Sequence, residues 1–522
     1  MHEKILFERN ISMDNNFKLD ISKDDQIAFN NNALFCIGTG RMGLALQKAY
    51  HDQLKFVQNK LGFKHIRGHG LFSDDMAIYQ VYKENGEKKV EYNFTYLDIV
   101  MDDYMSLGIK PFLELGFMPG KLASGEQTIF YWRGNVTPPK DYDEWARLIK
   151  ATLLHLIHRY GRDEVITWPI EVWNEPNLPG FWKDADMTEY FKLYEHSAKA
   201  VKEVDSGFRV GGPAICGVDD VRWLKEFLAF CDNNRVPIDF VTRHAYATEL
   251  PERIGHYDYQ KLRSPEIFLD ELKVSREIID SFLRFQGMEM HITEFNTSYT
   301  PKNPIHDTNL NAAYMARLLS EMGDTSASYS YWTFGDVFEE QGLAFTPFSG
   351  CFGLVANGMI PKPSFWTFEF FNRLKNKGVA RNNNMILTKG EDNSYHGIAW
   401  NPVEDIIQES NIEISLSLPA TEDEYVIITH LVDELTCNPL KNWIDIGLPS
   451  NPTKDQIELI RSCSYPRVET RRTTPKDGKI NLSLTLSRNA LLYFEVRAVK
   501  PTPDRGFYPD KIQGAYANQF TQ

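Results

Sequence analysis

Two glutamates lie in short motifs that could carry acid–base and nucleophilic chemistry. Glu175 belongs to EVWNEP (171–176), and Glu294 belongs to HITEFN (291–296). Glycoside hydrolysis needs such a pair, because a protonated acid must serve the leaving oxygen while an ionised carboxylate meets the anomeric carbon. A single glutamate on a strand is more often solvated or part of an ion pair. The prediction of hydrolysis therefore depends on the pair.

The elements that position these glutamates repeat one pattern eight times. Short apolar runs that predict strands are 33–40, 63–70, 110–117, 168–176, 208–215, 239–246, 288–296 and 326–336. Amphipathic stretches that predict helices are 44–61, 94–108, 142–160, 187–204, 221–231, 268–283, 309–322 and 363–375. Alternating strands and helices indicate a parallel sheet, and eight such units close a barrel. We therefore predict an α/β fold, a (β/α)8 TIM barrel.

A doubly wound dinucleotide-binding sheet is the rival fold for such alternation. It would carry a glycine-rich phosphate turn after its first strand. Here the first strand ends in GTGR (38–41), which lacks the third glycine of that turn. The barrel remains the better interpretation.

Active-site residues of such barrels lie at the carboxyl ends of the strands. Glu175 ends the fourth predicted strand and Glu294 the seventh. Because side chains alternate along a strand, we expect both carboxyl groups to face the barrel mouth. Rim and loop residues that we expect to bind a sugar are Asn174, His69, His244, Tyr246, Glu339, Glu340, Trp132 and Phe181.

The residue pattern of the sequence changes near residue 380. From there, segments in which apolar and polar residues alternate are separated by Asn, Asp, Gly and Pro, which predicts an appended antiparallel β-sandwich. We divide the chain into an N-terminal segment (1–32), the catalytic barrel (33–376), the sandwich with a short helical insertion (377–500) and a C-terminal tail (501–522). The N-terminal segment is expected to contribute a strand to the sandwich, and the tail is expected to be an oligomer contact.

Composition narrows the classes of partner and cofactor. The formal net charge is −14 over 522 residues, which argues against nucleic acid or an anionic membrane as partner. Six cysteines are scattered singly and no HExxH or similar motif appears, so we expect no metal and no cofactor. The first residues do not resemble a secretory signal, and we expect a cytoplasmic protein.

The motifs taken together resemble family 39 of the glycoside hydrolases, in particular its bacterial β-xylosidases. The ordered similarity covers most of residues 34–375. It includes CIGTGRMGLALQKAY (36–50), FKHIRGHGLFSDDM (63–76), LGIKPFLELGFMP (107–119), YWRGNVTPPKDYD (131–143), EVWNEPNLPGFWKDAD (171–186), VGGPAICG (210–217), DFVTRHAY (239–246), HITEFNTSY (291–299), YWTFGDVFEE (331–340) and MIPKPSFWTF (359–368).

The resemblance implies roles for individual residues. Glu175 corresponds to the family's acid/base, Glu294 to its nucleophile, and Asn174 to the residue that hydrogen-bonds the sugar 2-hydroxyl. The implied wall around the first sugar consists of His69, His244, Tyr246 and Glu339 or Glu340. Phe295 departs from the family, whose close relatives often carry tyrosine there; its side chain is expected to face away from the site.

The resemblance also implies an activity and an assembly. We expect a retaining, exo-acting enzyme that releases β-D-xylose from the non-reducing end of short xylo-oligosaccharides, often assembled as a homotetramer partly through C-terminal segments. The alternatives are a related glycosidase of the family, such as an α-L-iduronidase or another β-glycosidase, and a non-catalytic sugar-binding barrel. An iduronidase would need a positive charge beside the sugar carboxylate, whereas the eighth strand ends in acidic residues.

Overall fold

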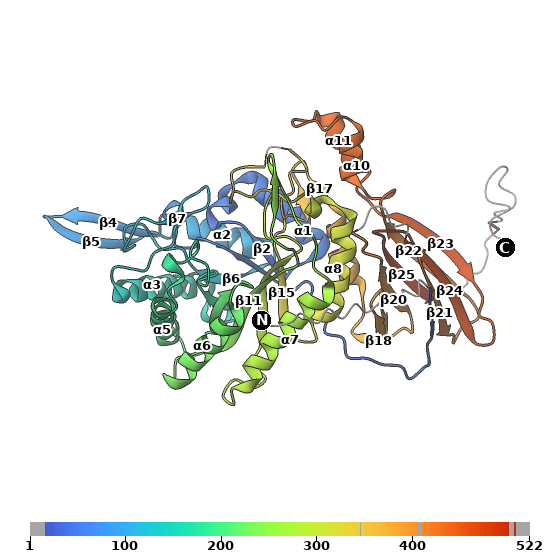
Figure 1. The fold of residues 1–522 in the computed structure, drawn as a ribbon, viewed down its shortest axis with the longest axis horizontal. Helices are drawn as coiled ribbons and strands as arrows, with labels where there is room; N and C mark the ends of the chain where they lie inside the picture. Colours follow the sequence, from blue (N-terminus) through green and yellow to red (C-terminus); the bar gives the residue numbers. More distant parts are fainter. Residues whose placement is uncertain (1–15, 345, 405–409, 501–505, 508–522) are drawn as a thin grey trace, which may run out of the picture.

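The computed structural model describes residues 16–344, 346–404, 410–500 and 506–507. Within it, eight parallel strands form a closed barrel (Figure 1). The strands are β2 (Cys36–Thr39), β3 (His65–Gly68), β6 (Lys110–Leu115), β9 (Ile170–Val172), β10 (Val210–Ile215), β11 (Phe240–Tyr246), β14 (Met290–Asn296) and β15 (Ser328–Tyr331). Each strand pairs with the next in this order, and β15 pairs with β2 to close the ring.

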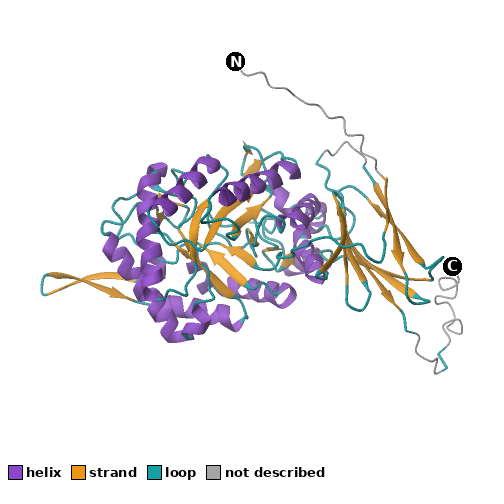
Figure 2. Ribbon diagram, turned by 90° about the horizontal axis from the view of Figure 1, so that it is seen from below, coloured by secondary structure: helices purple, strands orange, loops and turns teal. Residues whose placement is uncertain are grey.

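Helices surround the strand ring (Figure 2). The main helices are α1 (Lys48–Leu61), α2 (Thr95–Ser106), α3 (Tyr142–Tyr160), α5 (Met187–Val204), α6 (Asp220–Asn233), α7 (Pro265–Ser281), α8 (Asn309–Met322) and α9 (Pro363–Arg373), with the short α4 (Arg162–Val165) after α3. Strands and helices alternate where the apolar and amphipathic stretches predict them. The predicted (β/α)8 barrel is confirmed.

Helix α5 illustrates how a helix positions the site. It begins after Asp186, whose carboxylate accepts a hydrogen bond from the Glu189 N–H and so caps the helix. The buried face of α5 includes Tyr190, whose hydroxyl donates to the carbonyl oxygen of Val172 at 3.0 Å. Because Val172 is the last residue of β9, this contact fixes the strand end that precedes Glu175.

A buried ion cluster holds the loop that follows β15. The Lys362 ammonium is fully buried and lies 2.7 Å from Asp307 and 2.8 Å from Asp336. Asp336 also accepts the N–H of Gly353 at 2.7 Å. Since a buried charge is costly to leave unpaired, the three groups fasten the start of α9 to both ends of the loop that carries Glu340.

The barrel is followed by a β-sandwich. Its smaller sheet has the order β1 (Asn16–Asp20), β21 (Ile412–Pro419) and β24 (Lys479–Leu486). Its larger sheet has the order β18 (Lys377–Asn382), β19 (Met385–Lys389), β20 (Tyr395–Trp400), β25 (Leu491–Ala498), β22 (Tyr425–Val432) and β23 (Arg467–Thr473). Alternate residues of β21 and β24 are buried between the sheets, as the alternating sequence predicts.

The N-terminal segment contributes β1, which pairs in parallel with β21. Residues 1–15 and most of the tail expected to be an oligomer contact lie outside the described residues, so the boundaries 1–32, 33–376, 377–500 and 501–522 stay a proposal. The helical insertion contains α10 (Pro439–Asp445) as well as α11 (Lys454–Ser462). One short helical insertion is expected from the sequence, whereas the structure has two helices there.

A two-stranded arm extends from the barrel at the far end from the sandwich (Figure 1). It consists of β4 (Tyr79–Glu84) and β5 (Glu87–Tyr92), joined by Asn85 and Gly86 with φ of 50° and 82°. Small hairpins are also formed by β7 (Thr128–Ile129) with β8 (Gly134–Asn135), β12 (Glu252–Ile254) with β13 (Tyr257–Tyr259), and β16 (Val355–Ala356) with β17 (Ile360–Pro361). The sequence analysis does not anticipate these hairpins.

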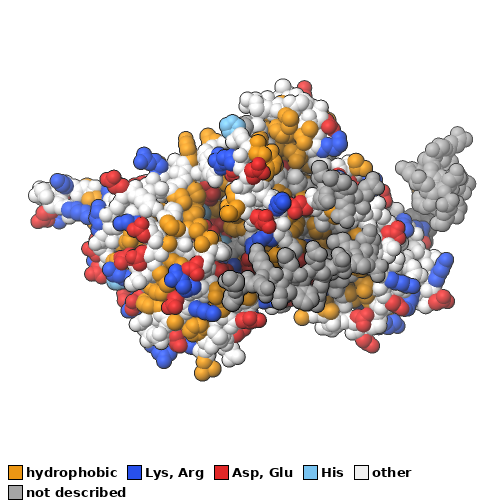
Figure 3. Space-filling view, in the orientation of Figure 1, with side chains coloured by type: hydrophobic (Ala, Val, Ile, Leu, Met, Phe, Trp, Pro, Cys, Tyr) orange, Lys and Arg blue, Asp and Glu red, His pale blue; other side chains and the backbone are white. Residues whose placement is uncertain are grey.

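The visible face in Figure 3 carries acidic and basic side chains interspersed with apolar ones. Within the described ranges, no helix is long and apolar enough to cross a membrane.

Candidate active site

The two predicted glutamates meet at the mouth of the barrel. Glu294 lies in β14, and Glu175 follows the end of β9. The backbone of Glu175 is left-handed, with φ of 44°, and its N–H donates to the carbonyl oxygen of Ala214 at 2.9 Å. Non-glycine residues rarely adopt this conformation, and such local strain is concentrated at functional sites. The loop is thus held in a turn that a regular strand would not provide.

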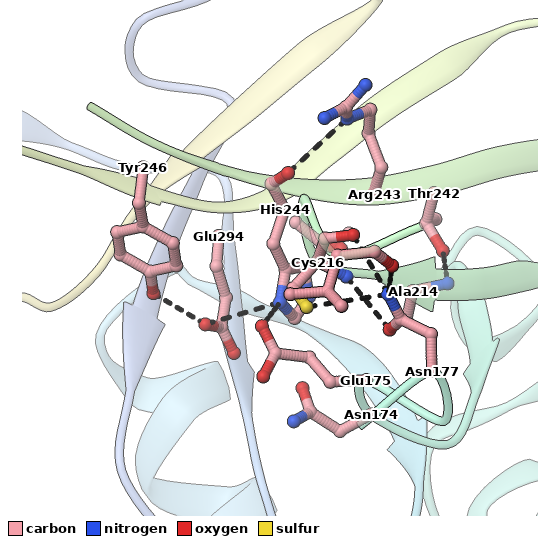
Figure 4. A network of polar contacts seen from close by, with 12 residues as sticks. Asn174, Glu175, Asn177, Ala214, Cys216, Thr242, Arg243, His244, Tyr246 and Glu294 are labelled. Atoms are coloured by element: carbon pink, nitrogen blue, oxygen red, sulfur yellow. Dashed lines mark hydrogen bonds and ion pairs between the residues drawn. The ribbon is translucent and has the colours of Figure 1, made fainter. Parts of the chain in front are cut away.

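His244 lies between the two carboxyl groups (Figure 4). Its Nδ1 is 2.8 Å from Oε1 of Glu175 and 3.4 Å from Oε2 of Glu294. One side-chain oxygen of each glutamate and one His244 nitrogen all lie within 4.8 Å of one another. Carboxyl groups about 5–5.5 Å apart are typical of retaining glycosidases, whereas inverting enzymes leave room for a water between groups about 6.5–9.5 Å apart.

Arg67 connects Glu294 to the barrel interior. Its fully buried guanidinium lies 2.5 Å from Glu294, 2.8 Å from Glu171 and 2.9 Å from Glu114. Burial lowers the pKa of Arg67, but the three neighbouring carboxyl groups outweigh it, and the net pKa is raised above its ordinary value. Arg67 therefore remains a cation, and it stabilises negative charge on Glu294.

The two glutamates have different electrostatic surroundings. Burial and the negative charge of Glu294 raise the pKa of Glu175 well above its ordinary value. Burial also raises the pKa of Glu294, but the Arg67 cation and a hydrogen bond of 2.7 Å from the Tyr246 hydroxyl oppose the rise. Glu175 therefore keeps its proton at a pH where Glu294 has lost its own.

Asn174 is oriented by the same guanidinium. Its Oδ1 accepts a hydrogen bond from Arg67 at 2.9 Å, and the side chain lines the cavity. Because the oxygen is committed to Arg67, the amide Nδ2 is the group left to donate to a bound molecule.

His69 forms the wall opposite His244. Its Nδ1 lies 2.7 Å from Glu114, and its Nε2 lies 3.6 Å from Glu294 and 3.8 Å from Glu340. Burial lowers the pKa of His69 to about 3, so the ring is neutral near pH 7. Burial and the charges of Glu294 and Glu175 raise the pKa of Glu340 well above its ordinary value.

Most of the expected site residues line one cavity of about 500 Å³. These are His69, Asn174, Glu175, Phe181, His244, Tyr246, Glu294 and Glu340.

Glu339 and Trp132 are placed elsewhere. Glu339 lies 2.7 Å from Arg41 and is also hydrogen-bonded by Gln47, so an ion pair directs it away from the cavity. The half-buried Trp132 packs against Phe117 and Phe130, their ring centroids 5.8 and 5.6 Å away.

Other lining residues escape the sequence analysis because they belong to loops. They include Phe130, Leu178, Val218, Thr248, Glu249, Leu250 and Arg263. Asn177, two residues after Glu175, is also missed, although a short polar side chain beside a catalytic motif is a usable signal. Phe295 packs against Tyr331 with ring centroids 5.7 Å apart, on the side away from the cavity.

The triad of Glu175, His244 and Glu294 is close enough to share a metal ion. The local charges oppose such binding, because Arg67 lies beside Glu294 and Glu175 holds a proton that a metal would have to displace. We predict that protein purified without chelators carries substoichiometric metal by mass spectrometry. One equivalent of zinc that disappears in Glu175→Ala would contradict this.

Comparisons with known proteins agree with this geometry. The family described as "Glycosyl hydrolases family 39" matches residues 17–481. A beta-xylosidase of Geobacillus stearothermophilus is 49% identical over 485 residues, which cover 92% of this chain and 96% of that protein. A beta-xylosidase of Caldicellulosiruptor saccharolyticus is 36% identical over 447 residues, covering 83% and 88%.

Solved structures give the same result. The crystal structure of a monomeric beta-xylosidase from Caulobacter crescentus CB15 superposes with a TM-score of 0.85 at 31% identity, covering 93% of this chain and 100% of that one. The match of the family extends over most of the chain and includes both rim glutamates. The chain therefore belongs to family 39 of the glycosyl hydrolases.

Proposed function

We propose that this protein is a retaining, exo-acting β-xylosidase that releases β-D-xylose from the non-reducing end of short xylo-oligosaccharides. The observation that carries the proposal is the short separation of the two rim carboxyl groups, whose oxygens lie within 4.8 Å. This separation suits a covalent glycosyl-enzyme. The activity named for the two relatives described above supports xylose as the sugar.

In the first step, an oxygen of Glu294 attacks the anomeric carbon while Glu175 gives its proton to the departing oxygen. The bond from the sugar to the leaving group breaks, and an ester to Glu294 forms. Arg67 and Tyr246 keep Glu294 ionised and oriented before the attack. The Asn174 amide is placed to donate to the 2-hydroxyl, a contact that strengthens in the transition state.

In the second step, Glu175 removes a proton from water, and the water oxygen displaces Glu294 from the sugar. Glu175 can change from acid to base because esterification removes the charge of Glu294. That charge is one of the two main reasons why the pKa of Glu175 is high. Its pKa therefore falls when a base is needed.

One end of the cavity is lined by His69 and Glu340, and we call it the polar end. This end favours removal of a terminal sugar. His69 lies there between Phe130 and Trp332, with ring centroids 5.9 and 4.8 Å away. The backbone N–H of Tyr131 donates to the Glu340 carbonyl oxygen at 2.8 Å and joins two loops over this end. One sugar fits against the polar groups, and a longer chain would have to leave through the opposite side.

An α-L-iduronidase is the second candidate, and the polar end disfavours it. Glu340 faces this end, and behind it Arg41 is paired with Glu339 and Asp75. The sugar carboxylate of iduronate would thus meet an acid rather than a free cation. A non-catalytic sugar-binding protein would not need two carboxyl groups at a retaining distance.

The homotetramer and the cytoplasmic location inferred from the sequence stay predictions. The relative from Caulobacter crescentus CB15 described above is a monomeric beta-xylosidase.

The two glutamates should respond differently to substitution. Glu294→Ala should lower kcat by about 10⁴-fold or more on every xyloside, because no nucleophile remains. Glu175→Ala should lose about 10²–10⁴-fold on xylobiose but keep the first step on 2,4-dinitrophenyl β-xyloside, whose leaving group needs no proton. Azide should then accelerate the second step and yield β-xylosyl azide.

Steady-state kinetics and product analysis by NMR measure these effects. Glu226→Ala, which removes an exposed glutamate of α6, is the matched control and should leave the kinetics unchanged. A loss for Glu175→Ala that is the same for every leaving group would contradict the acid role.

The pH profile of kcat/KM should be bell-shaped. As the pH falls, Glu294 is protonated and attack stops; because its pKa is raised, this limb should lie above the ordinary glutamate value of about 4.3. As the pH rises, Glu175 loses its proton and the alkaline limb follows. In Glu175→Ala with 2,4-dinitrophenyl β-xyloside, the alkaline limb should vanish while the acid limb persists.

The sugar itself is tested with paired substrates. We expect turnover of xylobiose and 4-nitrophenyl β-D-xyloside and none of 4-methylumbelliferyl α-L-iduronide, because Arg41, the cation beside Glu339, is already paired with Glu339 and Asp75 and does not meet the sugar carboxylate. Release of aglycone from the iduronide in preference to the xyloside would favour the second candidate. Binding of xylose without turnover of any substrate would favour a non-catalytic protein.

A further inference from the structure

One wall of the cavity is apolar. Leu178, Phe181, Val218 and Leu250 line it, together with the buried Cys216. The side chain of Val218 is 55% exposed and that of Leu250 is 88% exposed. Apolar side chains that gather in the lining of a functional cavity mark the binding of an apolar group.

This wall lies on the leaving-group side of Glu175. Of the polar groups expected around the terminal sugar, His244 and Tyr246 lie on β11, whereas His69 after β3 and Glu340 after β15 lie across the ring. Val218 follows β10, and Leu250 follows β11, on the other side of Glu175 in the ring. A group that leaves with the proton of Glu175 therefore departs past these two side chains.

Asn177 holds the wall in place (Figure 4). Its Nδ2 donates to the carbonyl oxygens of Cys216 and Val218 at 3.0 and 2.7 Å, and its Oδ1 accepts the Cys216 N–H at 3.1 Å. Asn177 is itself buried, with 4% of its surface exposed. The wall is thus formed before any ligand binds, and little ordering entropy opposes binding.

The terminal nitrogens of Arg263, which also lines the cavity, are already engaged. Arg263 donates to Glu271 and to the carbonyl oxygen of Tyr246, both at 2.5 Å. A second xylose would bring hydroxyl groups to a surface where the terminal nitrogens of the Arg263 guanidinium already have hydrogen-bond acceptors. An alkyl or aryl group would instead cover the exposed Val218 and Leu250.

We infer that the leaving-group side of the site also accepts an apolar aglycone, so that n-alkyl β-xylosides are bound through contacts of the alkyl chain to Val218 and Leu250. This inference rests on the proposed function. Burial of each methylene removes apolar surface from water, which contributes about 0.8 kcal/mol when burial is complete.

A series of n-alkyl β-D-xylosides tests the inference. From butyl to octyl, the acidity of the leaving alcohol hardly changes, so differences in kcat/KM report binding along the wall rather than reactivity. We expect kcat/KM to rise about two- to fourfold per methylene until the chain passes Leu250. All substrates are used below their micelle concentrations.

Variants assign the effect to the wall. Val218→Thr preserves the shape but adds a hydroxyl, and Leu250→Ser truncates an exposed side chain. Each should flatten the dependence on chain length, measured as the ratio of kcat/KM for octyl and butyl β-xyloside within the same variant. Leu283→Ser, at a side chain 91% exposed just after α7, is the matched control and should keep the full dependence.

The outcomes separate the two proposals. A flat alkyl series with normal turnover of methyl β-xyloside and xylobiose overturns the apolar aglycone site and leaves the proposed function intact. A full dependence retained in Val218→Thr and Leu250→Ser also overturns it. Failure to hydrolyse any xyloside overturns the proposed function, and this inference with it.

Discussion

One buried guanidinium organises the catalytic end of the barrel. Arg67 on β3 contacts Glu114 on β6, Glu171 on β9 and Glu294 on β14, and so joins four strands across the lumen. A charge without solvent is tolerated only when it is paired and hydrogen-bonded, so these acids and Arg67 require one another. The same guanidinium also orients Asn174. Stability and catalytic geometry therefore depend on a single group, and only a closed ring brings its partners within reach.

Arg67 also decides which carboxyl group carries charge. Glu175, Glu294 and Glu340 line one cavity that holds neutral histidines, and low polarity makes several neighbouring anions costly. Only Glu294 of the three contacts the guanidinium, at 2.5 Å. The pKa values of the other two are raised well above the ordinary value, and in the proposed mechanism one serves as acid while the other faces the sugar. In the proposed mechanism, a nucleophile and an acid of the same residue type thus differ through Arg67 and the Tyr246 hydroxyl, which both contact Glu294.

The sequence predicts the frame of this site well and its loops poorly. Eight strand–helix repeats and the period of two along β14 suffice to place Glu294 at the rim. Glu175 lies beyond the end of β9, and its left-handed turn orients it rather than the period of a strand. Loop geometry has no such period. From the sequence, Glu339 and Glu340 are equally good candidates for the site, and it is the ion pair of Glu339 with Arg41 in the structure that distinguishes them. The arm of β4 and β5 is different, since its Asn85–Gly86 pair is a hairpin signal that could have revealed it. The parallel pairing of β1 depends on contacts nearly 400 residues apart in the chain.

Under the proposed mechanism and the inferred aglycone site, the loop after β9 couples proton transfer to recognition of the leaving group. Glu175 supplies the proton, Asn177 fixes the backbone after β10, and Leu178 and Phe181 line the cavity beside it. The N–H of Leu178 donates to the carbonyl oxygen of Glu175 at 3.0 Å, so the acid and the wall move as one turn. A leaving group that fits the wall is therefore held near the proton it must receive. Its binding energy contributes to orienting the glycosidic bond for cleavage.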